Sequence, residues 1–242
     1  MDEYILDLGM PFNCVKITIS RKDIKNVHLK VFRDLQIILS LPENVPDEWI
    51  IDFLNKKRDW IKNQLSKYKQ ASGYNNLLEI KSGSSTQMLG KDRRIIKKYS
   101  AKSYVAEDEK NIYVYVKALD DDMLSQRVLR KWWRDKAFEI YNEEMMILYE
   151  RIFRKYNIDI PSIRIKKMKT LWGSCIPAKG KITLNEYLLK ADQRCIQYVI
   201  LHELTHLLYP YHNNDFYNFL TVQMPDWKVR KEQLDKEVVQ GL

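Results

Sequence analysis

Three of the four histidines in this 242-residue chain lie between positions 202 and 212, with Glu203 among them. If this segment is helical, His202 and His206 project from one face with their Cβ atoms about 5–6 Å apart. Two imidazoles at that spacing can reach one zinc ion at about 2.0–2.1 Å. Pro210 ends the helix, so the chain can turn and add His212 as a third ligand. Three nitrogen ligands leave the fourth tetrahedral position to water, and the spacing therefore predicts one catalytic zinc ion.

Glu203 directly follows the first predicted ligand, so it can take a proton from the zinc-bound water without itself binding the metal. Zinc lowers the pKa of such a water toward ~7 and polarises the oxygen of the substrate. The pattern therefore predicts a zinc-dependent hydrolase in which Glu203 activates a water that attacks a polarised carbonyl. At this composition HExxH is expected by chance only roughly 0.004 times in the chain, which argues against a coincidental pair of helix histidines.

The net charge of +9, from 41 Lys and Arg against 32 Asp and Glu, is spread along the chain. Residues 1–120 carry 21 basic and 16 acidic side chains (+5), and residues 121–242 carry 20 and 16 (+4). An even excess suits anionic substrates or partners but indicates no dedicated nucleic-acid motif. No stretch approaches the roughly 18 uncharged apolar residues of a membrane span. Three separated cysteines without a CxxC pair favour reduced thiols in a cytoplasmic protein.

Hydrophobic periodicity predicts an α+β fold, with a β-rich N-terminal module over residues 1–120 and an α-rich module over 121–242. In the first module, alternating patterns predict strands at 15–20, 27–31, 35–39, 86–90, 94–98 and 112–117. An apolar stripe predicts a helix from residue 47 to about 69, and a segment containing Gly, Ser and Asn predicts a loop at 71–85.

Helical patterns dominate the second module. The predicted elements are a long helix over 123–156, two short strands at 163–168 and 181–184, a helix from about 192 to 208, and two short closing helices. A loop containing Trp172–Cys175 joins the two strands. This order places His202 and His206 on a helix that follows a small sheet.

Four segments of the second module resemble the YgjP-like metal-dependent hydrolase family, a zincin-type metallopeptidase-like group related to the SprT-like and WLM families. They are Met168–Cys175, Ile182–Asn185, His202–His212 and Pro225–Trp227. Asp59–Ile61 also matches, so the likeness spans nearly the whole chain. The resemblance implies a zincin-like module with a short sheet and an HExxH helix. It also implies zinc on the three histidines and a catalytic Glu203.

Three further residues are candidates for substrate binding. Trp172 could form a wall of the pocket, Ser174 could orient a substrate, and Asn185 could bind a substrate backbone. Each also has a structural alternative, because a glycine-permitted turn with a packed Trp, and a turn-capping Asn, need no ligand. Cys175 is expected to be a buried thiol, since a fourth ligand would close the zinc site.

Three functions are compatible with this site. The first is metallopeptidase-type hydrolysis of a peptide or amide bond. The second, which the family resemblance implies for some members, is a nucleoside triphosphate pyrophosphatase that converts UTP to UMP and pyrophosphate. The third is a non-catalytic, zinc-stabilised interaction module. A basic run containing Arg164, Lys166, Lys167 and Lys169 is either a solvated strand face or a guide for an anionic substrate.

Overall fold

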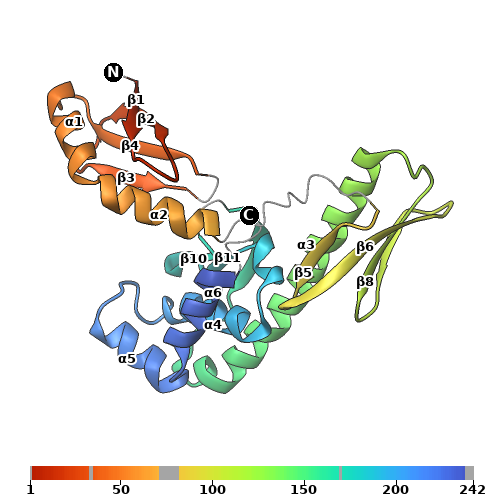
Figure 1. Cartoon of the computed structure of the whole chain (residues 1–242). Helices are drawn as coiled ribbons and strands as arrows, with labels where there is room; N and C mark the ends of the chain where they lie inside the picture. The colour runs from red at the N-terminus through yellow and green to blue at the C-terminus, as the bar shows by residue number, and fades with distance from the viewer. Residues whose placement is uncertain (1, 33–34, 71–81, 169–170, 238–242) are drawn as a thin grey trace. The chain divides into compact units, whose positions relative to one another are not determined.

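Two sets of strands and helices form separate hydrophobic cores in the computed structural model of the chain (Figure 1). The structure describes residues 2–32, 35–70, 82–168 and 171–237. The chain divides into compact units of Met1–Ser72 and Gly73–Gly241. Most of the loop predicted at 71–85 lies outside the described residues.

The first unit is a four-stranded sheet with two helices. Its strands are β1 (Glu3–Asp7), β2 (Cys14–Lys22), β3 (His28–Val31) and β4 (Ile37–Pro42), in the spatial order β1-β2-β4-β3. Its helices are α1 (Asp47–Lys56) and α2 (Arg58–Gln70). Alternation in β2 buries Ile17 and Ile19, as predicted. The single helix predicted from residue 47 is two helices, because the chain leaves helical geometry at Lys57 (φ −94°, ψ 2°).

The second unit begins with another four-stranded sheet. Its strands are β5 (Ser85–Met88), β6 (Lys91–Tyr99), β7 (Tyr104–Glu107) and β8 (Asn111–Val116), in the order β5-β6-β8-β7. Strands β7 and β8 contact helix α3 (Asp122–Leu148), and Ile112 of β8 shares one core with Trp133 of α3. The compact units therefore divide the chain before this sheet, whereas the sequence patterns suggested a division near residue 120.

Helix α3 runs along this unit between the β5–β8 sheet and helix α4 (Gln193–Thr205) (Figure 1). The Asp121 side chain caps its N-terminus by accepting a hydrogen bond from the Leu124 N–H at 2.8 Å. After α3 the chain continues as a π-helical turn (Tyr149–Phe153) and a 3₁₀ turn (Arg154–Tyr156). The helical region predicted over 123–156 is confirmed, although its last two turns are not α-helical.

A small mixed sheet and three helices complete the second unit. The strands are β9 (Ser162–Lys166), β10 (Gly173–Ile176) and β11 (Lys181–Asn185), in the order β10-β11-β9. The last helices after α4 are α5 (Asn214–Gln223) and α6 (Trp227–Glu237). Residues 173–175, predicted as loop, are in strand β10, which pairs antiparallel with β11. The α+β class and the short sheet before the histidine helix are confirmed. In the described residues, no helix is both long and apolar enough to cross a membrane.

Candidate metal centre

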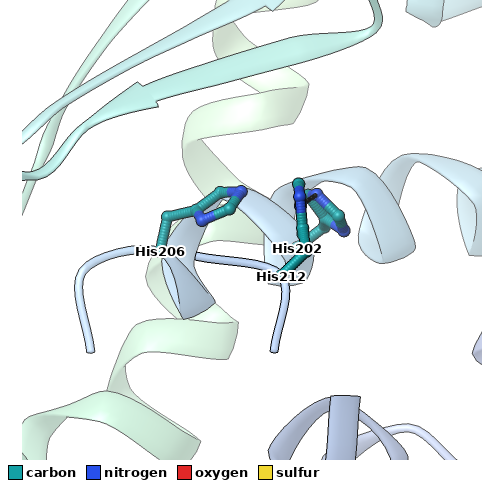
Figure 2. Close-up of side chains that lie close together, drawn as sticks. All are labelled: His202, His206 and His212. Atoms are coloured by element: carbon teal, nitrogen blue, oxygen red, sulfur yellow. Dashed lines mark hydrogen bonds between the residues drawn. The ribbon is translucent and has the colours of Figure 1, made fainter. Parts of the chain in front are cut away.

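Helix α4 and the segment after it bring the three histidines together (Figure 2). His202 lies in the last turn of α4, and His206 follows its final residue with helical backbone angles (φ −62°, ψ −21°). The four-residue spacing therefore acts as predicted, even though α4 ends at Thr205. The chain then turns through Pro210, which has no N–H to continue a helix, and His212 returns toward the other two rings.

The three imidazoles lie close enough to share one ion. One nitrogen from each ring lies within 4.8 Å of the corresponding nitrogen of the others, and the ring centroids are 4.6–5.1 Å apart. The Nε2 atoms of His202 and His212 are 2.9 Å apart. Two nitrogen ligands about 2.0–2.1 Å from one zinc ion lie at most about 4.2 Å apart, so the three rings need to move little or not at all to share an ion.

Burial favours the neutral form of two of the three imidazoles, which leaves their lone pairs available. It lowers the pKa of His202 to about 3, and the pKa of His206 is also lowered, chiefly by burial. The His206 Nδ1 lies 3.2 Å from the carbonyl oxygen of Tyr209. Because a carbonyl only accepts, Nδ1 donates this bond and Nε2 is left with a free lone pair. The Nδ1 of His202 is buried without a hydrogen-bond partner in the described structure. Neutral nitrogens that converge in this way fit a borderline cation such as zinc.

Glu203 lies beside this cluster in an apolar setting. Its side chain is buried, and burial raises the pKa of the Glu203 carboxyl to about 8. Strand β10 covers it at Gly173, where an added Cβ would lie 2.7 Å from Glu203 Oε1 and 2.8 Å from its Cγ. Gly173 is therefore required for close packing against the carboxyl group, and not for a turn.

Phe216 is a component of the site that sequence reasoning missed. Its fully buried ring lies 4.9 Å from the His202 ring, 4.8 Å from His206 and 4.7 Å from His212, centroid to centroid. Asn213 caps α5 by accepting a hydrogen bond from the Phe216 N–H at 3.0 Å, which fixes the start of the helix. The signal available in the sequence was a helix-capping Asn three residues before a large apolar side chain, but nothing in the local sequence connects Phe216 to α4.

Asn185 has its side chain occupied inside the protein. It is fully buried and donates hydrogen bonds to the carbonyl oxygens of Met168 at 2.8 Å and Leu171 at 2.9 Å. Its Oδ1 accepts from the Tyr187 N–H at 3.2 Å. The Asn185 side chain therefore holds the segment that leads into β10, and a substrate could reach it only by breaking these bonds.

Trp172 and Ser174 lie next to the same strand. Trp172 is half-buried and packs against the core, and its carbonyl accepts a hydrogen bond from the Asn185 N–H at 2.9 Å. Ser174 points to the opposite face of β10 from Gly173 and Cys175, since side chains alternate along a strand. Burial, with a smaller contribution from Glu203, raises the pKa of the Cys175 thiol to about 12, so Cys175 is a neutral thiol.

Three converging imidazoles beside a buried glutamate, carried by a helix that packs on a small sheet, define a metal-dependent hydrolase. Residues 25–237 match the model of the family described as YgjP-like, metallopeptidase domain. The chain belongs to this family, as the resemblance of its motifs indicated.

Two solved structures of archaeal metallopeptidase zymogens are similar to parts of the chain. Abylysin from Pyrococcus abyssi has 18% sequence identity and a TM-score of 0.37, over 42% of this chain and 98% of that one. Jannalysin from Methanocaldococcus jannaschii has 27% identity and a TM-score of 0.30, over 39% of this chain and 92% of that one. No curated protein matches the sequence.

Proposed function

We propose that this chain hydrolyses peptide or amide bonds with a single zinc ion held by His202, His206 and His212, and with Glu203 as the catalytic base. The observation that carries the proposal is the convergence of three imidazoles beside a buried carboxyl group. The family supplies the class of reaction, and the donor set favours zinc among the divalent metals.

The chain's own residues have distinct parts in this reaction. When bound, zinc would polarise the scissile carbonyl and acidify the attacking water. A Glu203 oxygen takes the proton of that water and then delivers it to the leaving nitrogen. The apolar surroundings of Glu203 suit both transfers, because they bring the pKa of the carboxyl toward neutral pH, while a nearby cation favours its charged form.

Substrate contacts are proposed for two of the three residues selected from the sequence. Trp172 supplies an apolar wall on the segment that adjoins Glu203 through Gly173. Ser174 orients the substrate through the backbone of β10, because its side chain points away from the face that Gly173 presents to Glu203. Asn185 is proposed as a positioning residue that acts through its bonds to the carbonyls of Met168 and Leu171. A cytoplasmic location remains the expectation from the cysteine pattern.

Hydrolysis of casein and of UTP by wild type and Glu203→Gln tests the proposal. We expect wild type to cleave casein but not UTP, and Glu203→Gln to lose about 10²–10⁴-fold of that activity. Glu143→Gln, an exposed change on α3, is the matched control and should leave the rate unchanged. Hydrolysis of UTP alone would assign the pyrophosphatase reaction instead. Hydrolysis of neither compound would favour the third alternative, a non-catalytic, zinc-stabilised interaction module.

A further inference from the structure

A basic groove of about 880 Å³ lies between helix α3 and strand β9. None of the three histidines, Glu203 or Phe216 lines it. Six basic side chains do, and they come from both walls: Arg127, Arg130, Lys131, Arg134, Arg164 and Lys167. Only two acidic residues, Asp135 and Glu186, are among the lining residues, so the groove carries a net charge of about +4.

Most of this charge is not neutralised within the protein. Arg134 lies 3.8 Å from a Glu186 oxygen, but in the described residues Arg127, Arg130 and Arg164 have no ion-pair partner. Arg127, Arg130 and Arg134 recur at helical spacing along one face of α3, over about 10 Å. Like charges held on one face repel each other, and an anion in the groove would relieve that repulsion.

The other wall is the free edge of β9. In the sheet order β10-β11-β9, β9 pairs only with β11 among the strands of the described residues. The consecutive residues Ile163, Arg164 and Ile165 all line the groove. Because neighbouring side chains on a strand point to opposite faces, a cavity that touches three in a row must meet the edge of the strand, where unpaired backbone N–H and C=O groups lie.

We propose that this groove is an exosite that binds an acidic polypeptide segment in extended conformation, paired along the free edge of β9. Alternate residues of such a segment lie about 6.6 Å apart, which is close to the ~5.4 Å rise of one turn of α3, so successive acidic side chains can each reach one arginine. The five residues of β9 provide an edge for a segment of similar length.

The lining favours a polypeptide over a single-stranded nucleic acid. Nucleic-acid grooves combine positive charge with aromatic rings on which bases stack. Phe138 is the only aromatic residue among those that line this groove. A strand edge, in contrast, offers the donors and acceptors that a peptide backbone uses.

Fluorescence anisotropy with a labelled octapeptide of alternating Glu and Thr tests the proposal, with Glu203→Gln as the parent protein so that no cleavage interferes. We expect binding that weakens at least about tenfold in Arg127→Gln/Arg130→Gln/Arg164→Gln. Arg151→Gln/Lys155→Gln/Lys179→Gln removes the same charge from exposed positions outside the groove and should change the affinity less than about twofold. Equal weakening by both triple variants would overturn the assignment of the site.

Two further probes test the binding mode. The same octapeptide with an N-methyl group on every residue cannot donate a backbone hydrogen bond from either of its edges, and we expect at least about fivefold weaker binding. Unchanged affinity would contradict pairing on β9. An oligouridylate of equal charge should bind more weakly than the peptide, and tighter binding that competes with the peptide would assign the groove to nucleic acid. No binding of the peptide at all would refute the exosite. The hydrolytic proposal would still stand, because it is tested separately by the loss of casein hydrolysis in Glu203→Gln.

Discussion

Gly173 lies so close to Glu203 that a Cβ built on it would be 2.7 Å from the carboxyl Oε1 and 2.9 Å from Cδ. This contact links strand β10 to the HExxH helix. It explains why glycine is needed in a strand where a side chain would otherwise be favoured. The position of the carboxyl group therefore depends on the absence of one methyl group in β10.

Gly173→Ala should displace Glu203 and lower kcat by about 100-fold, because displacements of about 1 Å at a catalytic group have effects of this size. Zinc content should stay unchanged, since no histidine lies in β10. Steady-state kinetics and metal analysis check both expectations, with Ile176→Ala at the exposed end of the same strand as a control. Full activity in Gly173→Ala would show that the carboxyl can move without consequence.

The sequence could predict the histidine cluster because its geometry is local. A four-residue spacing on one helix puts His202 and His206 on one face, and a following proline lets the chain turn so that His212 can approach them. The role of Gly173 could not be predicted, because strand β10 is short and lacks an alternating apolar pattern. The contacts of Phe216 join α5 to α4, and tertiary contacts of this kind cannot be predicted from local sequence patterns.

The boundary between the two parts of the chain also depends on tertiary packing that local sequence patterns do not reveal. Strands β6 and β8 were predicted from their own alternation, but their placement depends on α3. Ile112 and Trp133 belong to one core, and this relation appears only once the helix is packed on the sheet. Helix and strand periods are local properties, whereas the partners of each apolar face are not.

Phe216→Leu should weaken zinc binding by about tenfold. The ring contacts all three imidazoles and fixes their orientation, as partners behind metal ligands commonly do. Leu keeps most of the apolar volume, so the fold should survive, whereas Phe→Ala in a core costs about 3–5 kcal/mol. Competition with a zinc chelator measures the affinity. Phe219→Leu, whose ring contacts Phe153 instead, serves as control, and an equal effect there would refute a specific role for Phe216.

Asn185→Ala should destabilise the protein by roughly 2–4 kcal/mol, because two partly buried carbonyl groups and the N–H groups of Met168 and Tyr187 lose their partner. Urea denaturation measures this loss. The KM for a short peptide should stay within about twofold of wild type at a temperature where both proteins are folded. A large rise in KM with unchanged stability would instead indicate that Asn185 binds substrate.

Lys190 should make stability depend on pH in the alkaline range. Burial lowers the pKa of Lys190 from 10.5 to about 8, so between these values the unfolded chain holds a proton that the folded chain has released. The free energy of unfolding should therefore rise between pH 8 and about 9, and Lys190 alone contributes toward a limit of roughly 3 kcal/mol. Above pH 9 the Cys175 thiol offsets further gain, because burial raises its pKa from 9.0 to about 12 and the folded chain keeps a proton that the unfolded chain releases. Above pH 10 the rise should reverse, since burial raises the pKa of Tyr141 well above its usual value.

Lys190→Met should remove this dependence and raise stability at pH 7. Urea denaturation at several pH values checks it, and Lys179→Met at an exposed position is the matched control. A stability difference between wild type and Lys190→Met that stays constant between pH 8 and 9.5 would show that Lys190 titrates normally in the folded protein.

Zinc content per chain, measured by mass spectrometry on purified wild type, His206→Ala and Glu203→Gln, tests the central claim most directly. The three-histidine site predicts close to one zinc ion per chain in wild type, its loss in His206→Ala, and its retention in Glu203→Gln. No metal in wild type, or undiminished zinc in His206→Ala, would contradict the assignment of the metal centre.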